Sequence, residues 1–340
     1  MASESNPDSP DIEIDTATLG GPRSTALMTH ASPPSDSDPI AIAARGREIT
    51  KESLFGNTTD DSDVARIHEL VAEMNRDIPA GGVDIEYGSQ VTQRLRFWKS
   101  ALHKPPLILF VHGGSWRSGT YLDSIGSAKV THLTDKGYTF ATVNYTLVPY
   151  VTVEEQVQEV ADSLGYLVQN AARLGFHPER IVLMGHSSGA HIVTLLGTDS
   201  GYLDRAGVGI ANVQGIIALD GSNYNALAET IDSPGPVAEN TTYALGTDPN
   251  RLRAVSPVHH ACGPKARAFL LLHVQRNGDI RQAMELSLVL TAAGTKNALH
   301  VFEGQGFEGH MQMLLRIGDP SYPATGVMTT WLQEHVPIEQ

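Results

Sequence analysis

The sequence predicts an α/β domain in which a mostly parallel sheet carries helices on both faces. Strongly apolar runs of strand length recur between residues 83 and 303. Amphipathic or apolar segments of helical length separate several of these runs, and such alternation is typical of β-α units with parallel strands. One apolar run, residues 181–185, passes through a glycine-bounded turn directly into a helical segment. These observations together favour one large α/β domain.

The strand predictions depend on apolar content. Residues 107–112, LILFVH, form a continuous apolar run, as expected for a parallel strand that helices cover on both sides. The other predicted strands are residues 83–88, 93–98, 138–145, 181–185, 213–220, 266–274 and 298–303.

The helix predictions depend on apolar residues at helical spacing. In residues 63–75 these positions form a single stripe, which indicates a helix with one buried face. The other predicted helices are residues 154–170, 189–198, 282–293 and 325–336. Residues 222–252 have few strand signals, and we expect them to form a short lid over the site.

The N-terminal part differs in composition from the rest. Residues 1–45 are rich in Ser, Pro and Asp and lack hydrophobic periodicity, so we interpret them as a disordered acidic tail. The α/β domain is then expected to span residues 46–338. The start shows no basic, apolar leader typical of a secretory signal, and no stretch has the length of a membrane span.

The net charge of −14 argues against nucleic acid and anionic membranes as partners. Seven acidic residues and one arginine lie within residues 1–40, so the remainder of the chain is acidic as well. Cys262 is the only cysteine, which excludes an internal disulfide and fits a cytoplasmic location. The sequence leaves the oligomeric state open.

Gly185-His186-Ser187-Ser188-Gly189 has the form G-x-S-x-G between an apolar strand and a helix. A turn this tight strains its central residue, and glycines at both ends avoid side-chain clashes. Ser187 then projects at the carboxyl edge of the sheet, beside a helix N-terminus whose N–H groups favour an oxyanion. We interpret Ser187 as a nucleophile.

A second glycine loop, Val111-His112-Gly113-Gly114-Ser115-Trp116, follows the strand at 107–112. Adjacent glycines let backbone amides approach a substrate closely. We expect the amides of Gly113, Gly114 and Ser188 to form an oxyanion hole. His112 is interpreted as structural, since its ring can hold the loop backbone, and Trp116 as a wall of the substrate pocket.

The motifs HGGSW, NYTLVP at 144–149 and GHSSGAH at 185–191 resemble α/β-hydrolase esterases of the hormone-sensitive-lipase type. Within that group the sequence is most similar to the arylformamidase (kynurenine formamidase) and small carboxylesterase branch. The resemblance is firm from about Leu107 to Thr198 and weaker from there to Leu332. It implies an α/β-hydrolase fold with Ser187 as nucleophile, and an oxyanion hole at the HGG loop and the residue after the serine.

The resemblance also implies a base and an acid after Ser187. His310, in GQGFEGHMQM, matches the catalytic histidine of the family in place and context. The family usually has its aspartate four residues after a histidine such as His273, where this sequence has Asn277. Asp279 is the nearest carboxylate and is therefore predicted as the acid. Asn277 is an alternative, and Asp220 a third choice expected to cap a turn instead.

These residues predict a serine hydrolase that cleaves a carboxylic ester or an aryl formamide through an acyl-enzyme. The resemblance does not separate a carboxylesterase from an arylformamidase that acts on N-formylkynurenine. A different class, a ligand-binding receptor on a disabled hydrolase fold, is favoured only by the displaced acid. Tyr224 in the predicted lid is expected to contact substrate. Since no H-E-x-x-H or spaced Cys/His set occurs, we expect no metal and no cofactor.

Overall fold

The carboxyl ends of adjacent parallel strands meet at one edge of a central sheet, and this edge carries the predicted motifs. The structure is a computed structural model that describes residues 81–122 and 125–339. The predicted tail 1–45 and the predicted helix 63–75 lie outside the described residues. In the described part, the sheet has eight strands in the order β1-β2-β4-β3-β5-β6-β7-β8. They are β1 Val83–Glu86, β2 Arg94–Trp98, β3 Leu107–Val111, β4 Thr139–Val143, β5 Ile181–His186, β6 Val213–Leu219, β7 Ala268–Gln275 and β8 Lys296–Gln305.

The sheet is mostly parallel. Strand β2 pairs antiparallel with both β1 and β4, and each later neighbour pair is parallel. All eight predicted strands are present. The predicted mostly parallel sheet with helices on both faces is therefore confirmed.

Alternation along the strands divides the core into two layers. Leu107, Leu109 and Val111 of β3 pack into one layer, whereas Ile108 and Phe110 pack into the other. Since successive side chains of a strand point to opposite faces, a continuous apolar run is what a doubly covered strand requires. All five residues have no exposed surface.

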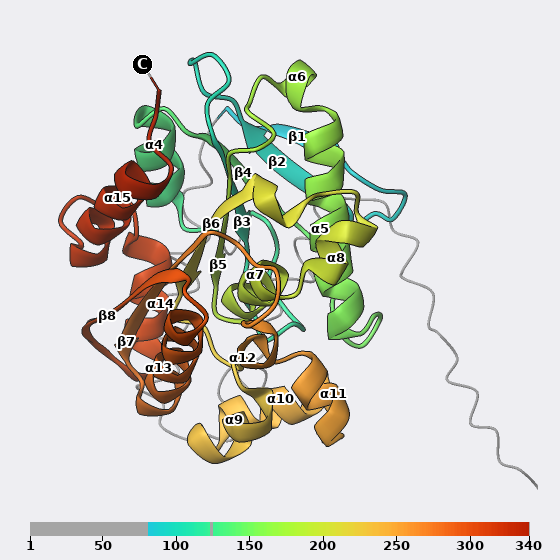
Figure 1. Ribbon diagram of the computed structural model, residues 1–340, viewed down its shortest axis with the longest axis vertical. Coiled ribbons are helices and arrows are strands. Elements are labelled where there is room, and N and C mark those ends of the chain that lie inside the picture. The colour runs from blue at the N-terminus through green and yellow to red at the C-terminus, as the bar shows by residue number, and fades with distance from the viewer. Residues whose placement is uncertain (1–80, 123–124, 340) are drawn as a thin grey trace, which may run out of the picture. The chain divides into compact units, whose positions relative to one another are not determined.

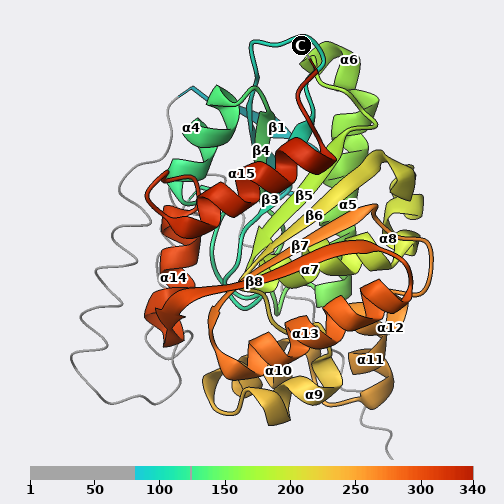
Figure 2. The ribbon, with the colours of Figure 1, turned by 60° about the vertical axis from the view of Figure 1, so that its left-hand side comes forward.

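Helices cover both faces (Figures 1 and 2). On one face lie α4 Ser127–Asp135, α14 Gly306–Arg316 and α15 Pro323–His335. The opposite face carries α5 Val153–Gln169, α7 Ser188–Thr198, α8 Ser200–Arg205 and α13 Asn277–Ala292. Short helices complete the described part: α6 Ala171–Leu174, η1 Ile210–Asn212, α9 Ala226–Asp232, α10 Pro236–Leu245, α11 Pro249–Ala254 and α12 Pro257–His260.

The structure defines the helices more closely than the sequence did. The segment predicted as a lid, residues 222–252, contains α9 and α10 and part of α11, which lie together beside α13 (Figure 2). Helix α13 begins at Asn277 and not at Gln282, so it follows β7 with almost no loop. Helices α4, α8 and α14 were not predicted, and the structure places His310 within α14 and not between a strand and a helix.

The register of the parallel strands brings three polar residues together. His186 of β5 pairs with Leu219 of β6, and Leu219 pairs with Leu272 of β7. Ser187 and Asp220, which follow these positions, therefore leave the sheet side by side, next to His273, which still lies within β7. In the described part of the chain, no helix is long and apolar enough to span a membrane.

Candidate active site

Ser187 occupies a strained turn between β5 and α7. Its backbone has φ 56° and ψ −124°, an unfavourable conformation for a residue with a side chain. The turn is held because the Ser187 amide donates to the Leu219 carbonyl at 3.0 Å. A Cβ atom at Gly185 would lie 2.2 Å from the Gly189 carbonyl oxygen, and one at Gly189 would lie 2.2 Å from that of Val111. Glycine is thus required at both ends of the G-x-S-x-G turn.

His310 lies in α14 and packs against the residue that precedes Ser187. The ring centroids of His186 and His310 are 4.3 Å apart, and His186 Nε2 is 3.0 Å from the His310 carbonyl oxygen. Burial and the repulsion of nearby charges lower the pKa of His186 well below its usual range. His186 is therefore neutral and can donate this hydrogen bond, which fixes the position of His310.

Asp220 is the carboxylate that contacts His310. Its Oδ2 atom lies 2.6 Å from His310 Nδ1, and the carboxylate has no exposed surface. The Val274 amide donates to Oδ1 at 3.0 Å, and the Asp220 amide donates to the Leu272 carbonyl at 2.7 Å. Asp220 is therefore anchored to β7 on both its backbone and its side chain.

Charge and hydrogen bonds keep Asp220 ionised. Burial alone would raise the pKa of this carboxyl, but the Arg276 guanidinium, the nearby His273 ring and the hydrogen bond from His310 hold it well below its usual range. The His310 pKa is itself lowered, first by burial and then by Arg276, while Asp220 opposes the shift. An ionised Asp220 accepts the Nδ1 proton of His310, which leaves Nε2 as the proton acceptor of the ring.

The predicted contact between Asp279 and His310 is corrected by this geometry. Asp279 Oδ2 pairs with Arg276 at 2.9 Å, and its Oδ1 has no hydrogen-bond partner among the described residues. The reason is local: because α13 begins at Asn277, the segment after β7 is too short to carry Asp279 or Asn277 toward His310. Arg276 lies between Asp279 and His310 and contacts both. Asp220, which was expected only to cap a turn, is the residue whose carboxylate contacts His310.

The glycine loop lies against the serine turn. A Cβ atom on Gly113 would be 2.8 Å from Ser187 Cβ, so the loop backbone approaches Ser187 directly. The amides of Gly113, Gly114 and Ser188 have no acceptor within the described residues. The Gly114 carbonyl, in contrast, accepts from the amides of residues 117 and 118 at 3.1 and 3.0 Å. The Gly114 carbonyl thus fixes the loop, while the three amides remain available to donate to a substrate oxygen.

Buried side chains brace this loop. His112 Nδ1 is 2.8 Å from the Gly113 carbonyl, and burial lowers the pKa of His112 to about 4, so the ring is neutral. The Tyr145 hydroxyl donates to the His112 carbonyl at 2.8 Å, and the two rings stack. The Trp116 amide donates to Ser188 Oγ at 3.2 Å, which ties the loop to α7. The interpretation of His112 as structural agrees with these contacts.

The two predicted substrate contacts are both buried. Trp116 is 2% exposed and meets His191 edge-on, with ring centroids 5.3 Å apart. Tyr224 has no exposed surface and packs in the core layer with α7 and α13. Its hydroxyl lacks a hydrogen-bond partner in the described part of the chain. A role in substrate binding stays a prediction for both residues.

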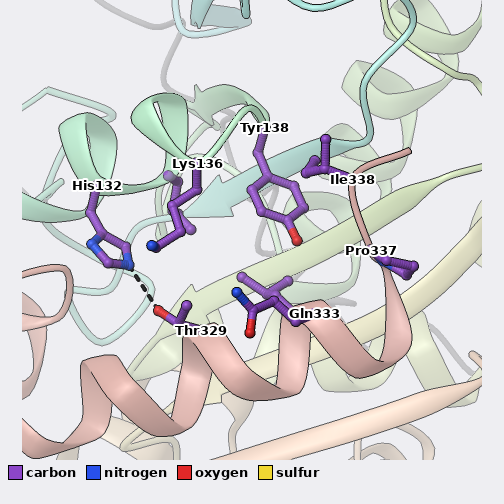
Figure 3. Close-up of a pocket in the computed structure, with 9 residues that line it drawn as sticks. His132, Lys136, Tyr138, Thr329, Gln333, Pro337 and Ile338 are labelled. Atoms are coloured by element: carbon purple, nitrogen blue, oxygen red, sulfur yellow. Dashed lines mark hydrogen bonds between the residues drawn. The ribbon is translucent and has the colours of Figure 1, made fainter. Parts of the chain in front are cut away.

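A pocket of about 210 Å³ lies elsewhere, between α4, α15 and the C-terminal segment (Figure 3). His132 Nε2 and Thr329 Oγ1 are 2.8 Å apart at one side of it. Ser187, Asp220, His310 and the glycine loop at Gly113 and Gly114 do not line this pocket. Within residues 81–122 and 125–339, no group of three His, Cys, Asp or Glu residues is arranged to hold a metal ion.

Known proteins resemble this chain in both sequence and fold. Residues 97–280 match the BD-FAE family, which is more than half of the chain, so the chain belongs to that family. It is an α/β hydrolase related to esterases and arylformamidases, as the resemblance implied.

Curated relatives cover shorter segments. A probable isoprenylcysteine alpha-carbonyl methylesterase from Oryza sativa subsp. japonica is 31% identical over 150 residues, 42% of this chain and 35% of its own length. A kynurenine formamidase from Drosophila melanogaster is 28% identical over 148 residues, 44% of this chain and 40% of its own. The matching segment thus spans well under half of the length of these relatives.

Solved structures support the fold over most of the chain. Esterase B from Lactobacillus rhamnosis has a TM-score of 0.65 at 16% identity, with 87% of this chain and 94% of that chain covered. An esterase from Thermogutta terrifontis has a TM-score of 0.60 at 21% identity, with 76% of this chain and 94% of that chain covered. At these identities the similarity shows the α/β-hydrolase fold alone.

Proposed function

We propose that this protein is a serine hydrolase that cleaves a carboxylic ester or an aryl formamide, with Ser187 as nucleophile, His310 as base and Asp220 as acid. One observation carries the proposal: the ionised, buried Asp220 accepts a hydrogen bond at 2.6 Å from the histidine packed beside the serine turn. The membership of the chain in the BD-FAE family supports the same reaction class.

The mechanism follows from the roles of these groups. Ser187 Oγ attacks the carbonyl carbon of the substrate and gives its proton to His310 Nε2, while Asp220 stabilises the imidazolium. The amides of Gly113, Gly114 and Ser188 hold the negative oxygen that forms. His310 then returns the proton to the leaving alcohol or amine. Water then gives a proton to His310 and attacks the acyl-Ser187 ester, and His310 passes that proton to Ser187 Oγ as the acid leaves.

The arylformamidase reading stays as the second candidate because kynurenine formamidases are among the curated relatives. Its acyl group would be formyl, and the acyl-enzyme would release formate. The receptor alternative loses its one supporting feature, since Asp220 supplies the carboxylate that seemed displaced. We propose a small-molecule ester or amide as the substrate, without nucleic acid or membrane as partner, and a cytoplasmic location.

Hydrolysis of a substrate panel tests the proposal. The panel contains 4-nitrophenyl acetate, 4-nitrophenyl butyrate and N-formylkynurenine, assayed with wild type, Ser187→Ala and the surface control Ser321→Ala. We expect Ser187→Ala to lose nearly all activity and Ser321→Ala to keep it, because Ser321 is exposed and its side chain hydrogen-bonds to Asp319 and Arg316. The ratio of kcat/KM values between esters and the formamide decides the substrate class. Absence of activity on every member in a folded wild type would contradict the proposal.

A further inference from the structure

Arg276 stands between two buried carboxylates at the end of β7. One terminal nitrogen, NH1, lies 2.7 Å from Asp220 Oδ2, and the other, NH2, lies 2.9 Å from Asp279 Oδ2. The Arg276 side chain is 16% exposed, and the two carboxylates are 0% and 3% exposed. A planar guanidinium that bridges two carboxylates in this way is held in one orientation.

The same nitrogen lies against the catalytic ring. Arg276 NH1 is 2.9 Å from His310 Nδ1, and both atoms are within hydrogen-bond distance of Asp220 Oδ2. A guanidinium nitrogen can only donate, and Nδ1 donates to the ionised Asp220. Neither therefore accepts from the other, so a fixed positive charge lies beside the edge of the ring.

This arrangement has two opposite effects on His310. Asp220 attracts the proton that the ring takes up from Ser187, whereas the Arg276 charge repels it. Arg276 also holds Asp220 Oδ2 where Nδ1 can reach it, and it keeps Asp279 away from the ring.

We infer that Arg276 is a positioning residue, an inference that rests on the function proposed above. Arg276 orients the Asp220 carboxylate toward Nδ1 of His310, and it keeps the His310 ring neutral and ready to accept a proton. It is not a binding residue for an anionic substrate, because both of its terminal nitrogens are already engaged by carboxylates.

The other ionisable groups around His310 act in the same region. They come from several elements: His186 at the end of β5, Asp220 after β6, His273 in β7, Asp279 in α13, Glu229 in α9, Lys129 in α4 and Glu308 in α14 itself. His273 Nδ1 is 3.4 Å from Asp220 Oδ1, so it approaches the carboxylate oxygen that His310 does not use.

Asp279 and Glu229 are the other two carboxyl groups whose charges act on Arg276. Burial raises the pKa of Asp279 to about 7, with Glu229 adding to the shift and Arg276 opposing it. Burial also raises the pKa of Glu229. Near neutral pH Asp279 is therefore only partly ionised, whereas Asp220 is fully ionised and carries the larger negative charge beside Arg276.

Four variants separate positioning from a purely structural role. Arg276→Met removes the charge and keeps much of the side-chain length. Arg276→Lys keeps the charge but cannot bridge both carboxylates. The double variant Arg276→Met/Asp279→Asn also neutralises the carboxylate that would be left unpaired, and so protects against loss of folding. Arg281→Met is the matched control, because this arginine is 51% exposed and pairs with Asp232 and Glu285 away from His310.

The experiment is an NMR titration of the full chain labelled at histidine ¹³Cε1, with the His310 signal assigned through His310→Gln. We expect Arg276→Met and the double variant to raise the His310 titration midpoint by about one pH unit or more, as removal of an adjacent like charge should. Arg276→Lys should raise it less, and Arg281→Met should leave it unchanged. The acid limb of kcat/KM against pH should move with the midpoint.

The outcomes separate this inference from the proposed function. An unchanged midpoint in the folded Arg276→Met and double variants overturns the positioning role, even if hydrolysis is found. A raised midpoint supports the role, because the titration does not depend on turnover. If the midpoint rises but the wild type hydrolyses no ester or formamide, the proposed function fails and the electrostatic role of Arg276 stands.

Discussion

His310 Nδ1 lies 2.6 Å from Asp220 Oδ2, although the two residues are 90 positions apart in the chain. Asp220 ends β6 and His310 lies in α14, so only the folded sheet brings them together. The acid of the proposed triad therefore follows β6, one strand earlier than the position after β7 that the family resemblance implied.

Separate substitution of Asp220 and Asp279 by asparagine tests this assignment. We expect Asp220→Asn to lower kcat by about 10⁴-fold, as loss of the triad carboxylate does elsewhere, with little change in KM. Asp279→Asn is the matched control, since it is equally buried but contacts Arg276 and not His310. Its effect on kcat should be much smaller. Steady-state kinetics of both variants decide the matter, and the reverse order of effects would restore Asp279 as the acid.

The pH profile should reflect the lowered pKa of His310. Burial and Arg276 favour the neutral ring, so His310 stays a competent base at lower pH than a free imidazole with its pKa of 6.5. Since the pKa of Asp220 is also depressed, the carboxylate stays ionised over the same range. We expect the acid limb of kcat/KM to fall below pH 6.5. A limb at or above that value would contradict this electrostatic description.

The approach of Gly113 to Ser187 leads to a substitution with a defined steric effect. In Gly113→Ala, the new Cβ would lie 2.7 Å from the His186 carbonyl oxygen and 2.8 Å from Ser187 Cβ. The loop must withdraw and take its amide with it, so we expect kcat to fall by about 10²-fold or more. Gly326→Ala is the control, because its Cβ would meet nothing within 4 Å. Equal activity of the two variants would argue against an oxyanion role for the Gly113 amide.

Lys129 gives a prediction about stability. Its buried amine donates to the carbonyls of Ile125, Gly126 and Leu314 and so connects α4 with α14, the helix that carries His310. Lys129→Met leaves these buried carbonyls without their donor, and we expect the free energy of unfolding to fall by on the order of 3 kcal/mol.

Urea denaturation of this variant measures the effect, with Lys136→Met as the control. Lys136 follows the same helix and is exposed, so its loss should change the free energy of unfolding by less than about 0.5 kcal/mol. Similar stability of the two variants would show that the Lys129 contacts contribute little.

Much of the fold could be predicted because its signals are local. The apolar run before Ser187 and the glycines around it identify a strand, a tight turn and a helix without reference to the rest of the chain. The loop at Gly113 and Gly114 is equally local. His310 was found through its resemblance to the family, in a segment predicted to lie between a strand and a helix.

The acid could not be predicted, because its identity depends on where helix α13 begins. Sequence spacing suggested a loop that could carry Asp279 to His310, but the helix starts at Asn277 and leaves Arg276 facing the ring. Asp220 is one of several carboxylates that follow apolar runs. The strand register, which no local pattern reveals, is what aligns it with Ser187.

Covalent labelling by a fluorophosphonate, followed by intact-mass measurement and peptide mapping, shows directly whether Ser187 is the nucleophile. We expect a single adduct on the peptide that contains Ser187, and none in a Ser187→Ala protein whose circular dichroism and thermal midpoint match the wild type. An adduct that maps to another residue, or labelling of folded Ser187→Ala at the wild-type rate, would contradict the assignment of Ser187 as the nucleophile.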